Sequence, residues 1–233
     1  MNNSNINIII PAFNEEASIS KVLNDLPQQC ISGVIVVDNG STDSTAKKAA
    51  ENGAIVVTEP RRGYGRACLT GIEMAKSMDP DIIVFLDGDY SDYPEQIEDV
   101  LQPIFEKKAD LVIGSRTQGD AKKGALLPQA RFGNWLASLL IKIFWGYTYT
   151  DLGPFRAITW EALISLKMQD TNFGWTVEMQ IKALMRGLQV IEVPVSYRKR
   201  IGVSKVTGTL KGTFGAGYKI LWTIFKYGFF KNT

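Results

Sequence analysis

The stretch VFLDGDYSDYP (residues 84–94) joins an apolar run to a cluster of acids. The apolar residues 83–86 lead directly into Asp87, Asp89 and Asp92. This pattern predicts a buried strand whose end presents carboxylates at one place. Carboxylates gathered in this way repel one another unless a cation or a proton lies between them. The stretch therefore predicts a strand followed by a site that holds one or the other.

The rest of the chain repeats this strand and alternates it with helices. The predicted strands cover residues 6–11, 33–38, 54–59, 81–87 and 110–115, and the predicted helices cover residues 15–26, 41–53, 65–77 and 94–108. The strands are nearly continuous apolar runs, as is typical of strands that are covered on both faces. Regular alternation of strand and helix predicts an α/β fold with a doubly wound, mostly parallel sheet flanked by helices.

Polar clusters follow three of the predicted strands. They read PAFNEE (residues 11–16), DNGSTD (residues 38–43) and DGDYSD (residues 87–92). Each cluster alone also fits a turn or a helix cap. In a parallel sheet, however, ligands bind beyond the carboxyl ends of the strands. Three clusters at successive strand ends on the same side therefore predict one shared ligand crevice.

Composition excludes several classes of protein. The 233 residues are 45% hydrophobic, which allows a sizeable core, and 26 basic against 24 acidic residues give a net charge of +2, too balanced to indicate nucleic-acid binding. The absence of histidine removes His-based triads and His metal ligands. The stretch RRGYGRA (residues 61–67) lacks the third glycine of a dinucleotide fingerprint and follows the third strand, which disfavours a dehydrogenase.

Location is predicted from what the sequence lacks. The two cysteines have no metal-like spacing and suggest a reducing cytosol. The start of the chain has no basic region typical of a signal peptide, and no apolar stretch reaches the roughly 18 residues of a membrane span. A cytoplasmic protein is expected.

The three polar clusters, in this order, resemble the family 2 glycosyltransferases of the GT-A fold. Four further segments resemble the branch that contains dolichyl-phosphate mannose synthase and dolichyl-phosphate glucosyltransferase: VIGSR (residues 112–116), RFGNW (residues 131–135), DLGPFRAI (residues 151–158) and RIGVSK (residues 200–205). The resemblance covers about residues 6–205. It implies a catalytic domain over residues 1–205 and leaves residues 206–233 as a C-terminal tail.

The resemblance implies a nucleotide-sugar site at the first two clusters and the last segment. Nucleotide-binding residues carried over from the family are Pro11, Ala12, Asn14, Glu15, Asp38, Gly40, Asp87, Gly88, Arg200 and Lys205. Of these, Asp38 is expected to bind the base, whereas Arg200 and Lys205 are expected to contact the diphosphate. Asp43 is expected to cap its helix instead.

The D-x-D motif implies a divalent metal. By resemblance Asp89 ligates the ion, and Asp87 positions the donor ribose or a water of the metal. Gly88 leaves room for the backbone to approach the ligand. A diphosphate leaving group is neutralised well by Mg²⁺ or Mn²⁺, which prefer carboxylate oxygens.

The acceptor side is implied by two arginines, Arg116 and Arg131, which match those that hold a lipid phosphate in the resembling branch. A phosphate acceptor is already an anion, so it needs to be held rather than deprotonated, and arginine forks suit that task. Asn134 stands where relatives carry serine. Asp151 is expected at a turn or near the metal.

These residues predict an inverting, metal-dependent glycosyltransferase. It would move a hexose from a nucleotide diphosphate sugar to an isoprenoid (polyprenyl or dolichyl) phosphate, and the resemblance favours UDP-glucose as the donor, with GDP-mannose next. Asp89, Arg116 and Arg131 are the expected catalytic residues. One alternative is a hydroxyl acceptor with Glu178 as the general base. Another is a catalytically silent protein that binds nucleotide sugars.

The tail predicts a membrane-surface helix. At helical spacing Lys219, Thr223 and Lys226 share one face, and the opposite face carries Leu210, Phe214, Leu221, Ile224 and Phe225. A helix of this kind lies on a bilayer rather than across it, which here would be the cytoplasmic face. A second apolar segment at residues 134–145 follows Arg131. Both helices also fit packing on the sheet or the contact of a homo-oligomer.

Overall fold

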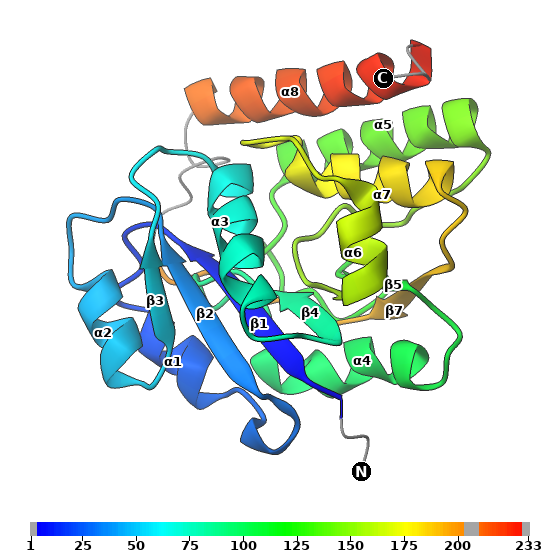
Figure 1. Cartoon of the computed structure of the whole chain (residues 1–233). Coiled ribbons are helices and arrows are strands. Elements are labelled where there is room, and N and C mark those ends of the chain that lie inside the picture. The colour runs from blue at the N-terminus through cyan, green and yellow to red at the C-terminus, as the bar shows by residue number, and fades with distance from the viewer. Residues whose placement is uncertain (1–3, 203–209, 230–233) are drawn as a thin grey trace.

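The computed structural model describes residues 4–202 and 210–229, the last of these ranges without the side chains of residues 210 and 211. Its strands are β1 (Ile6–Ala12), β2 (Gly33–Asp38), β3 (Ile55–Thr58), β4 (Ile82–Phe85), β5 (Leu111–Ser115), β6 (Arg156–Thr159) and β7 (Val190–Pro194). They form one sheet in the order β3-β2-β1-β4-β6-β5-β7 (Figure 1).

Helices cover the sheet on both sides. They are α1 (Ile19–Asn24), α2 (Thr45–Glu51), α3 (Tyr64–Lys76), α4 (Ile97–Phe105), α5 (Pro128–Trp145), α6 (Trp160–Leu166), α7 (Trp175–Met185) and α8 (Leu210–Phe229), with short 3₁₀ turns at Gln28–Cys30 and Pro94–Gln96. The predicted fold class, a mostly parallel α/β sheet flanked by helices, is confirmed. The helices α1 and α2 are shorter than their predicted ranges because the residues before them form the loops of the crevice.

The two strands that the sequence did not reveal are β6 and β7. Strand β6 runs antiparallel between β4 and β5, and β7 pairs parallel with β5 at the edge. The sequence of β6 is only four residues long and begins with a buried arginine, so no apolar run marks it. The expected burial of all strands on both faces is wrong for β3, because it forms the other edge and leaves Ile55 exposed.

The core lies in two layers because neighbouring residues of a strand point to opposite faces. Ile9 of β1 packs in the layer covered by α3, α6 and α7, whereas Ile8 and Ile10 pack in the layer covered by α1 and α4. All three side chains are fully buried. Each such burial stabilises the fold by about 1.5–3 kcal/mol. The sheet is therefore a rigid base for the loops at its carboxyl edge.

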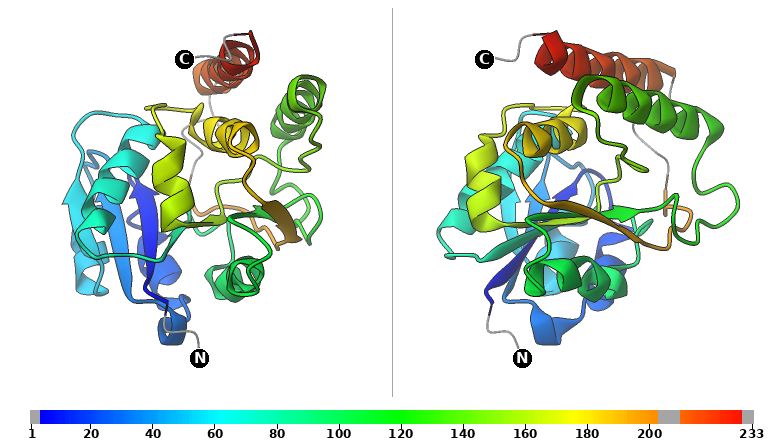
Figure 2. Two further views of the ribbon diagram at one scale, coloured as in Figure 1. Left: turned by 45° about the vertical axis from the view of Figure 1, so that its right-hand side comes forward. Right: turned by 90° about the vertical axis from the view of Figure 1, so that its right-hand side faces the viewer.

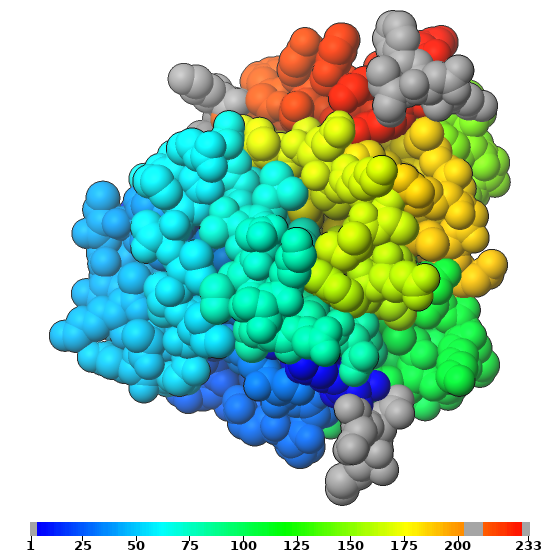
Figure 3. Space-filling model, in the orientation of Figure 1, coloured from blue at the N-terminus to red at the C-terminus, as the bar shows by residue number. Residues whose placement is uncertain are grey.

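Helices α5, α7 and α8 pack together at the end of the molecule opposite the N-terminus. Two further views show α8 outermost, running beside α5 and over α7 (Figure 2). The space-filling view shows α8 resting along the edge formed by the chain around residues 165–185 (Figure 3). No helix among residues 4–202 and 210–229 is long and apolar enough to cross a membrane.

The polar face of α8 is turned toward the protein. Lys219 and Thr223, which were expected to share one face, both lie on it: Thr223 is buried and Lys219 pairs with Asp170 of the protein body. Ile224, which was expected on the opposite, apolar face, is nevertheless fully buried. The reason is that α7 and the preceding loop offer carboxylates, which draw the polar face of α8 inward.

The outward face of α8 is aromatic instead. Its exposed large side chains are Phe214, Tyr218, Trp222, Phe225 and Phe229. Phe214 and Phe225 were expected there, Leu221 is half-buried, and the side chain of Leu210 lies outside the described residues. Helix α5 has a similar exposed stripe of Phe132, Trp135, Leu139 and Ile143.

Candidate active site

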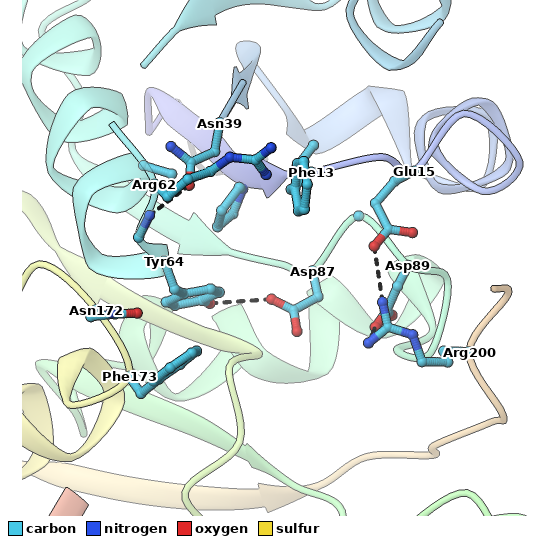
Figure 4. Close-up of a pocket in the computed structure, with 15 residues that line it drawn as sticks. Phe13, Glu15, Asn39, Arg62, Tyr64, Asp87, Asp89, Asn172, Phe173 and Arg200 are labelled. Carbon is cyan, nitrogen blue, oxygen red and sulfur yellow. Dashed lines mark hydrogen bonds and ion pairs between the residues drawn. The ribbon is translucent and has the colours of Figure 1, made fainter. Parts of the chain in front are cut away.

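A pocket of about 420 Å³ opens at the carboxyl ends of β1, β2 and β4, where the three polar clusters meet (Figure 4). Its lining residues are Pro11, Ala12, Phe13, Glu15, Asn39, Arg62, Gly63, Tyr64, Ala67, Asp87, Gly88, Asp89, Asn172, Phe173 and Arg200. The parallel strands β2, β1 and β4 are neighbours in the sheet, which is why their ends converge. The predicted shared crevice is therefore present.

Asp87 and Asp89 follow β4 and lie in this pocket. The Tyr64 hydroxyl donates to Oδ1 of Asp87 at 3.2 Å. Burial raises the pKa of Asp87 to about 7, and the negative charge of Asp89 acts in the same direction. Asp89 is held by the amide and hydroxyl of Ser91, both of which donate to its Oδ1.

Arg200 lies between two acids of the pocket. Its Nη1 is 3.0 Å from Oδ2 of Asp89, and its Nη2 donates to Oε1 of Glu15 at 2.9 Å. The backbone amide of Ile201 donates to the carbonyl of Asp89, which ties this segment to the D-x-D loop. The cation between the carboxylates of Glu15 and Asp89 is thus the guanidinium of Arg200. Lys205, expected beside it, lies outside the described residues.

Asp92, the third acid of the opening stretch, is buried, and neither of its oxygens has a hydrogen-bond partner among residues 4–202 and 210–229. Burial raises its pKa well above the usual range, and the negative charges of Asp87 and Asp89 add to the effect. Burial and these two charges therefore favour the neutral form of Asp92, whereas the charge of Asp89 is balanced by the Arg200 guanidinium.

The first two clusters are tied to each other. The Asn14 side-chain oxygen accepts from the Thr42 amide, and within the second cluster the Asp38 carboxylate accepts from the Ser41 amide. Pro11 and Ala12 line the pocket, whereas Asn14, Asp38 and Gly40 are not among its lining residues. Gly40 turns the chain with a φ of 73°.

Asp43 behaves as expected. Its carboxylate accepts from the amide of Thr45 at the first residue of α2, which satisfies one of the free donors of the helix start. It is not part of the pocket lining.

Arg116 and Asp151 form a bidentate ion pair. Its Nε and Nη2 donate to the two carboxylate oxygens, each at 2.7 Å. Asp151 is almost fully buried. Burial alone would raise its pKa, but the Arg116 charge and hydrogen bonds outweigh it and lower the pKa below the usual range. Nη1 of Arg116 has no hydrogen bond to the part of the chain that the structure describes, and so remains available to an anion.

Arg131 lies in the first turns of α5, exposed and with no ion pair to any described residue. Asn134, one turn further on, donates to the Thr150 carbonyl at 3.0 Å and accepts from the Leu152 amide at 2.8 Å. Arg116 grips Asp151 in the middle of that same segment. The segment 150–152 therefore connects the start of α5 to Arg116.

Glu178 does not lie in the pocket. Its carboxylate is buried and accepts hydrogen bonds from two backbone amides, from Tyr227 and from Lys182. This arrangement leaves Glu178 far less suited to the work of a general base than the sequence alone suggested.

Some lining residues were missed by the sequence analysis. The Arg62 guanidinium stacks over the Phe13 ring at 3.3 Å from its centroid. Tyr64 belongs to RRGYGRA, a stretch considered only as a failed dinucleotide motif. Asn172 and Phe173 come from the loop before α7, which no pattern of charge or hydrophobicity marks. Phe13 alone carried a signal, because it lies within PAFNEE, one of the three polar clusters.

The donor set fits a hard divalent cation. Asp87 and Asp89 supply carboxylate oxygens on one loop, and Arg200 already satisfies Asp89 as a cation would. Within residues 4–202 and 210–229 no group of three or more acidic or thiol side chains surrounds one point. An ion bound here would take its remaining ligands from a donor phosphate and water, as Mg²⁺ commonly does.

Comparisons with known proteins agree with this geometry. The model of the family described as glycosyl transferase family 2 matches residues 7–164. An uncharacterized glycosyltransferase of Mycobacterium tuberculosis is 36% identical over 214 residues, which cover 89% of this chain and 92% of the relative. The undecaprenyl-phosphate mannosyltransferase of Micrococcus luteus is 31% identical over 216 residues, 88% of each chain.

A solved structure has the same fold. The glucosyl-3-phosphoglycerate synthase of Mycobacterium tuberculosis, crystallised with Mn²⁺, uridine diphosphate and glucosyl-3-phosphoglycerate, superposes with a TM-score of 0.77. The match covers 97% of this chain and 80% of that one, at 23% sequence identity. At that identity the likeness concerns the fold alone.

Proposed function

The chain belongs to glycosyltransferase family 2, and we propose that it transfers a hexose, with inversion, from a nucleotide diphosphate sugar to an isoprenoid phosphate. The observation that carries the acceptor class is that segment 150–152 links two arginine-bearing elements. Arg116 pairs with Asp151 of that segment, and its Nη1 makes no hydrogen bond to any described residue. Arg131, which has no ion pair to any described residue, lies in the first turns of α5, whose Asn134 bonds to both ends of the segment. Family membership makes it a transferase rather than a silent binding protein.

The pocket at β1, β2 and β4 is proposed as the donor site. Phe13 and Arg62 offer a stacking surface for a base, and Asp38 lies behind it at the end of β2. Asp89 and Asp87 would hold Mg²⁺ or Mn²⁺, which when bound neutralises the diphosphate as a Lewis acid. The structural neighbour crystallised with Mn²⁺ and uridine diphosphate supports this assignment.

The reaction needs no general base. A phosphate oxygen of the acceptor attacks the anomeric carbon on the side opposite the diphosphate. The new carbon–oxygen bond forms as the bond to the diphosphate breaks, and the nucleotide diphosphate leaves with the electron pair. Arg200, released from Glu15 and Asp89, would neutralise the leaving group, with Lys205 as its expected partner. Arg116 and Arg131 would hold the nucleophile in line, so positioning and electrostatics supply the rate.

The exposed residues near Arg131 also support a lipid acceptor. Arg131 lies in the first turns of α5, whose exposed stripe includes Phe132 and Trp135, and α8 beside it exposes Tyr218 and Trp222. Aromatic residues of this kind are enriched where proteins meet the bilayer interface. The undecaprenyl-phosphate mannosyltransferase among the relatives acts on such a lipid by its name. We therefore place the protein at a bilayer surface, with residues 1–205 as catalytic domain and 206–233 as tail.

A hydroxyl acceptor with Glu178 as base has less support, because that carboxylate is buried and fully bonded. A soluble anionic acceptor is the stronger rival, since the structural neighbour was crystallised with a glucosylated phosphoglycerate. It would use the same two arginines without the exposed aromatic helices.

The decisive experiment supplies the full chain and Mn²⁺ with UDP-glucose, GDP-mannose or UDP-N-acetylglucosamine. Each donor is paired with a short polyprenyl phosphate, phosphoglyceric acid or a polyprenyl alcohol, and products are identified by mass. We expect a hexosyl polyprenyl phosphate, with UDP-glucose as the first donor to test and GDP-mannose as the next. Transfer to phosphoglyceric acid alone, or to the alcohol, would reject the lipid phosphate.

A further inference from the structure

The loop 169–174 forms a wall of the donor pocket although it lies outside the three polar clusters. It carries Asn172 and Phe173, which line the pocket on the same side as Tyr64 (Figure 4). The Thr171 carbonyl accepts from the Arg66 amide at the start of α3. The position of this loop therefore sets the width of the pocket.

The loop meets α3 at close range. A Cβ added at Gly63 would lie 2.2 Å from the Thr171 carbonyl oxygen, and one added at Gly65 would lie 2.1 Å from that of Asp170. Only glycine allows this approach of two backbones. A small outward movement of the loop would therefore break its contact with α3.

Two buried carboxylates hold the loop from behind. Glu178 accepts from the Gln169 amide at 3.1 Å and the Asp170 amide at 2.7 Å. Asp170 in turn accepts from the Asn172 amide at 2.7 Å and the Gly174 amide at 3.2 Å. The backbone of the wall is thus fixed by hydrogen bonds to charged acceptors, which are stronger than neutral ones.

Both carboxylates are contacted by the inward face of α8. Lys219 Nζ lies 3.0 Å from Oδ2 of Asp170, and the Tyr227 hydroxyl donates to Oε1 of Glu178 at 2.8 Å. With α8 in place the side chains of Asp170 and Glu178 are almost fully buried, so their oxygens depend on protein partners rather than on water. The two contacts form a continuous path from α8 to the pocket wall.

We propose that Lys219 and Tyr227 of α8, acting through Asp170 and Glu178, are positioning residues for the donor, an inference that rests on the proposed donor site. They touch no reacting atom. They hold loop 169–174 against α3, so that Asn172 and Phe173 stand where the nucleotide sugar binds. Because the outer face of the same helix is aromatic and exposed, the seating of α8 and the shape of the donor pocket are mechanically linked.

The test compares three variants of the full chain with a short soluble polyprenyl phosphate as acceptor. Lys219→Met keeps the aliphatic stem and removes the ion pair. We expect it to raise the donor KM about fivefold while kcat stays within about twofold, since one charged hydrogen bond to a buried acid is lost. Lys219→Arg should restore the KM. Lys142→Met is the matched control, because Lys142 is an exposed lysine of α5 with no carboxylate partner among the described residues.

A second readout does not depend on turnover. Hydrogen exchange at the Asn172 and Gly174 amides should accelerate in Lys219→Met and remain at the wild-type rate in Lys142→Met. If the wild type transfers no sugar to any acceptor, the proposed function fails. Amide exchange alone then tests whether α8 holds loop 169–174 in place. An unchanged donor KM in Lys219→Met, or exchange at those two amides equal to that of wild type, overturns the proposal. A lowered thermal midpoint with an unchanged KM would reduce the ion pair to a purely structural role and reject it as well.

Discussion

The donor pocket and the α5–α8 helical layer distribute their polar groups in opposite ways. In the pocket, Asp89, Glu15 and Arg200 face a cavity and satisfy one another until a ligand arrives. In the helical layer, Lys219 turns inward to Asp170, while Trp222 faces outward. The first arrangement suits ion pairs that exchange partners on binding. The second suits ion pairs that stay in place while an apolar surface meets its partner.

The aromatic side chains on the outward face of α8 are exposed although their burial would stabilise the fold. Covering a large apolar side chain contributes about 1.5–3 kcal/mol. Single exposed residues are normal on protein surfaces, but gathered ones mark a site of interaction. Phe214, Tyr218 and Phe229 on one helix, with Phe132 and Ile143 on another, make such a gathering. The donor pocket is thus suited to binding charged ligands, whereas the α5–α8 helical layer is suited to contact with an apolar surface.

The largest effect is expected in the pocket. Asp89→Ala should lower transfer by about 10²–10³-fold or more, because the leaving diphosphate loses its metal-borne counter-charge. The fold should survive, as judged by circular dichroism, since Asp89 contributes no apolar packing. Excess chelator should have the same effect on the wild type. Full activity in excess chelator would contradict the metal assignment.

The next largest effect is expected at Arg131, on the helix that belongs to the helical layer and carries the proposed acceptor contact. Arg131→Ala should lower transfer to polyprenyl phosphate by about tenfold to a hundredfold while leaving nucleotide affinity unchanged, because a charged contact to the acceptor is lost. Arg131→Lys should restore activity only in part, since the guanidinium fork is missing. Lys142→Ala, an exposed cation on the same helix, is the control. Lost nucleotide affinity by calorimetry would move Arg131 to the donor side.

A smaller, graded effect follows from Asp87, whose pKa burial raises to about 7. Below that pH a cation must displace its proton, so Mn²⁺ affinity should rise about tenfold per pH unit up to neutrality and level off above it. Asp87→Asn should flatten the profile, because no proton is then released. Calorimetric titration of Mn²⁺ across the range, with uridine diphosphate present, gives the measurement. A flat wild-type profile would show that Asp87 does not ligate.

The smallest effect is expected on the helical layer. Trp222→Ser combined with Phe229→Ser should weaken binding to anionic vesicles several-fold, because rings at the bilayer interface are buried only in part, and should leave transfer to a short soluble acceptor unchanged. These variants are sharper than removal of α8, which would also uncover Ile224. Vesicle sedimentation equal to that of wild type would mean that this face binds something other than lipid.

The sequence predicted the donor region well because its signals are local. Strands β1, β2 and β4 are apolar runs that lead into polar clusters, so the amino-acid pattern alone located Asp87 and Asp89 at a strand end. Phe173 was not predicted, because it reaches the pocket from a loop that carries no periodic pattern. Its position depends on the contact of that loop with Gly65, more than a hundred residues earlier in the chain.

The helical layer was predicted less well because periodicity does not fix direction. The spacing of α8 revealed a polar and an apolar face but not which of them turns toward the protein. That direction depends on Asp170 and Glu178, whose buried side chains require partners. Strand β6 was missed for a related reason: its first residue, Arg156, is fully buried and donates to the Gly153 and Thr176 carbonyls, so the strand begins with a charge rather than an apolar residue.

The bridge that Arg200 makes between Glu15 and Asp89 has a consequence for the order in which ligands arrive. A metal ion that enters alone must displace the Arg200 guanidinium from Asp89, so the guanidinium loses one of its two counter-charges and keeps only that of Glu15. A metal that enters with a nucleotide diphosphate supplies that counter-charge at the same moment. We therefore expect ion and nucleotide to add as a complex or in close succession, with weak affinity for either alone. In steady-state kinetics the free ion would then behave as part of the donor rather than as a separate activator.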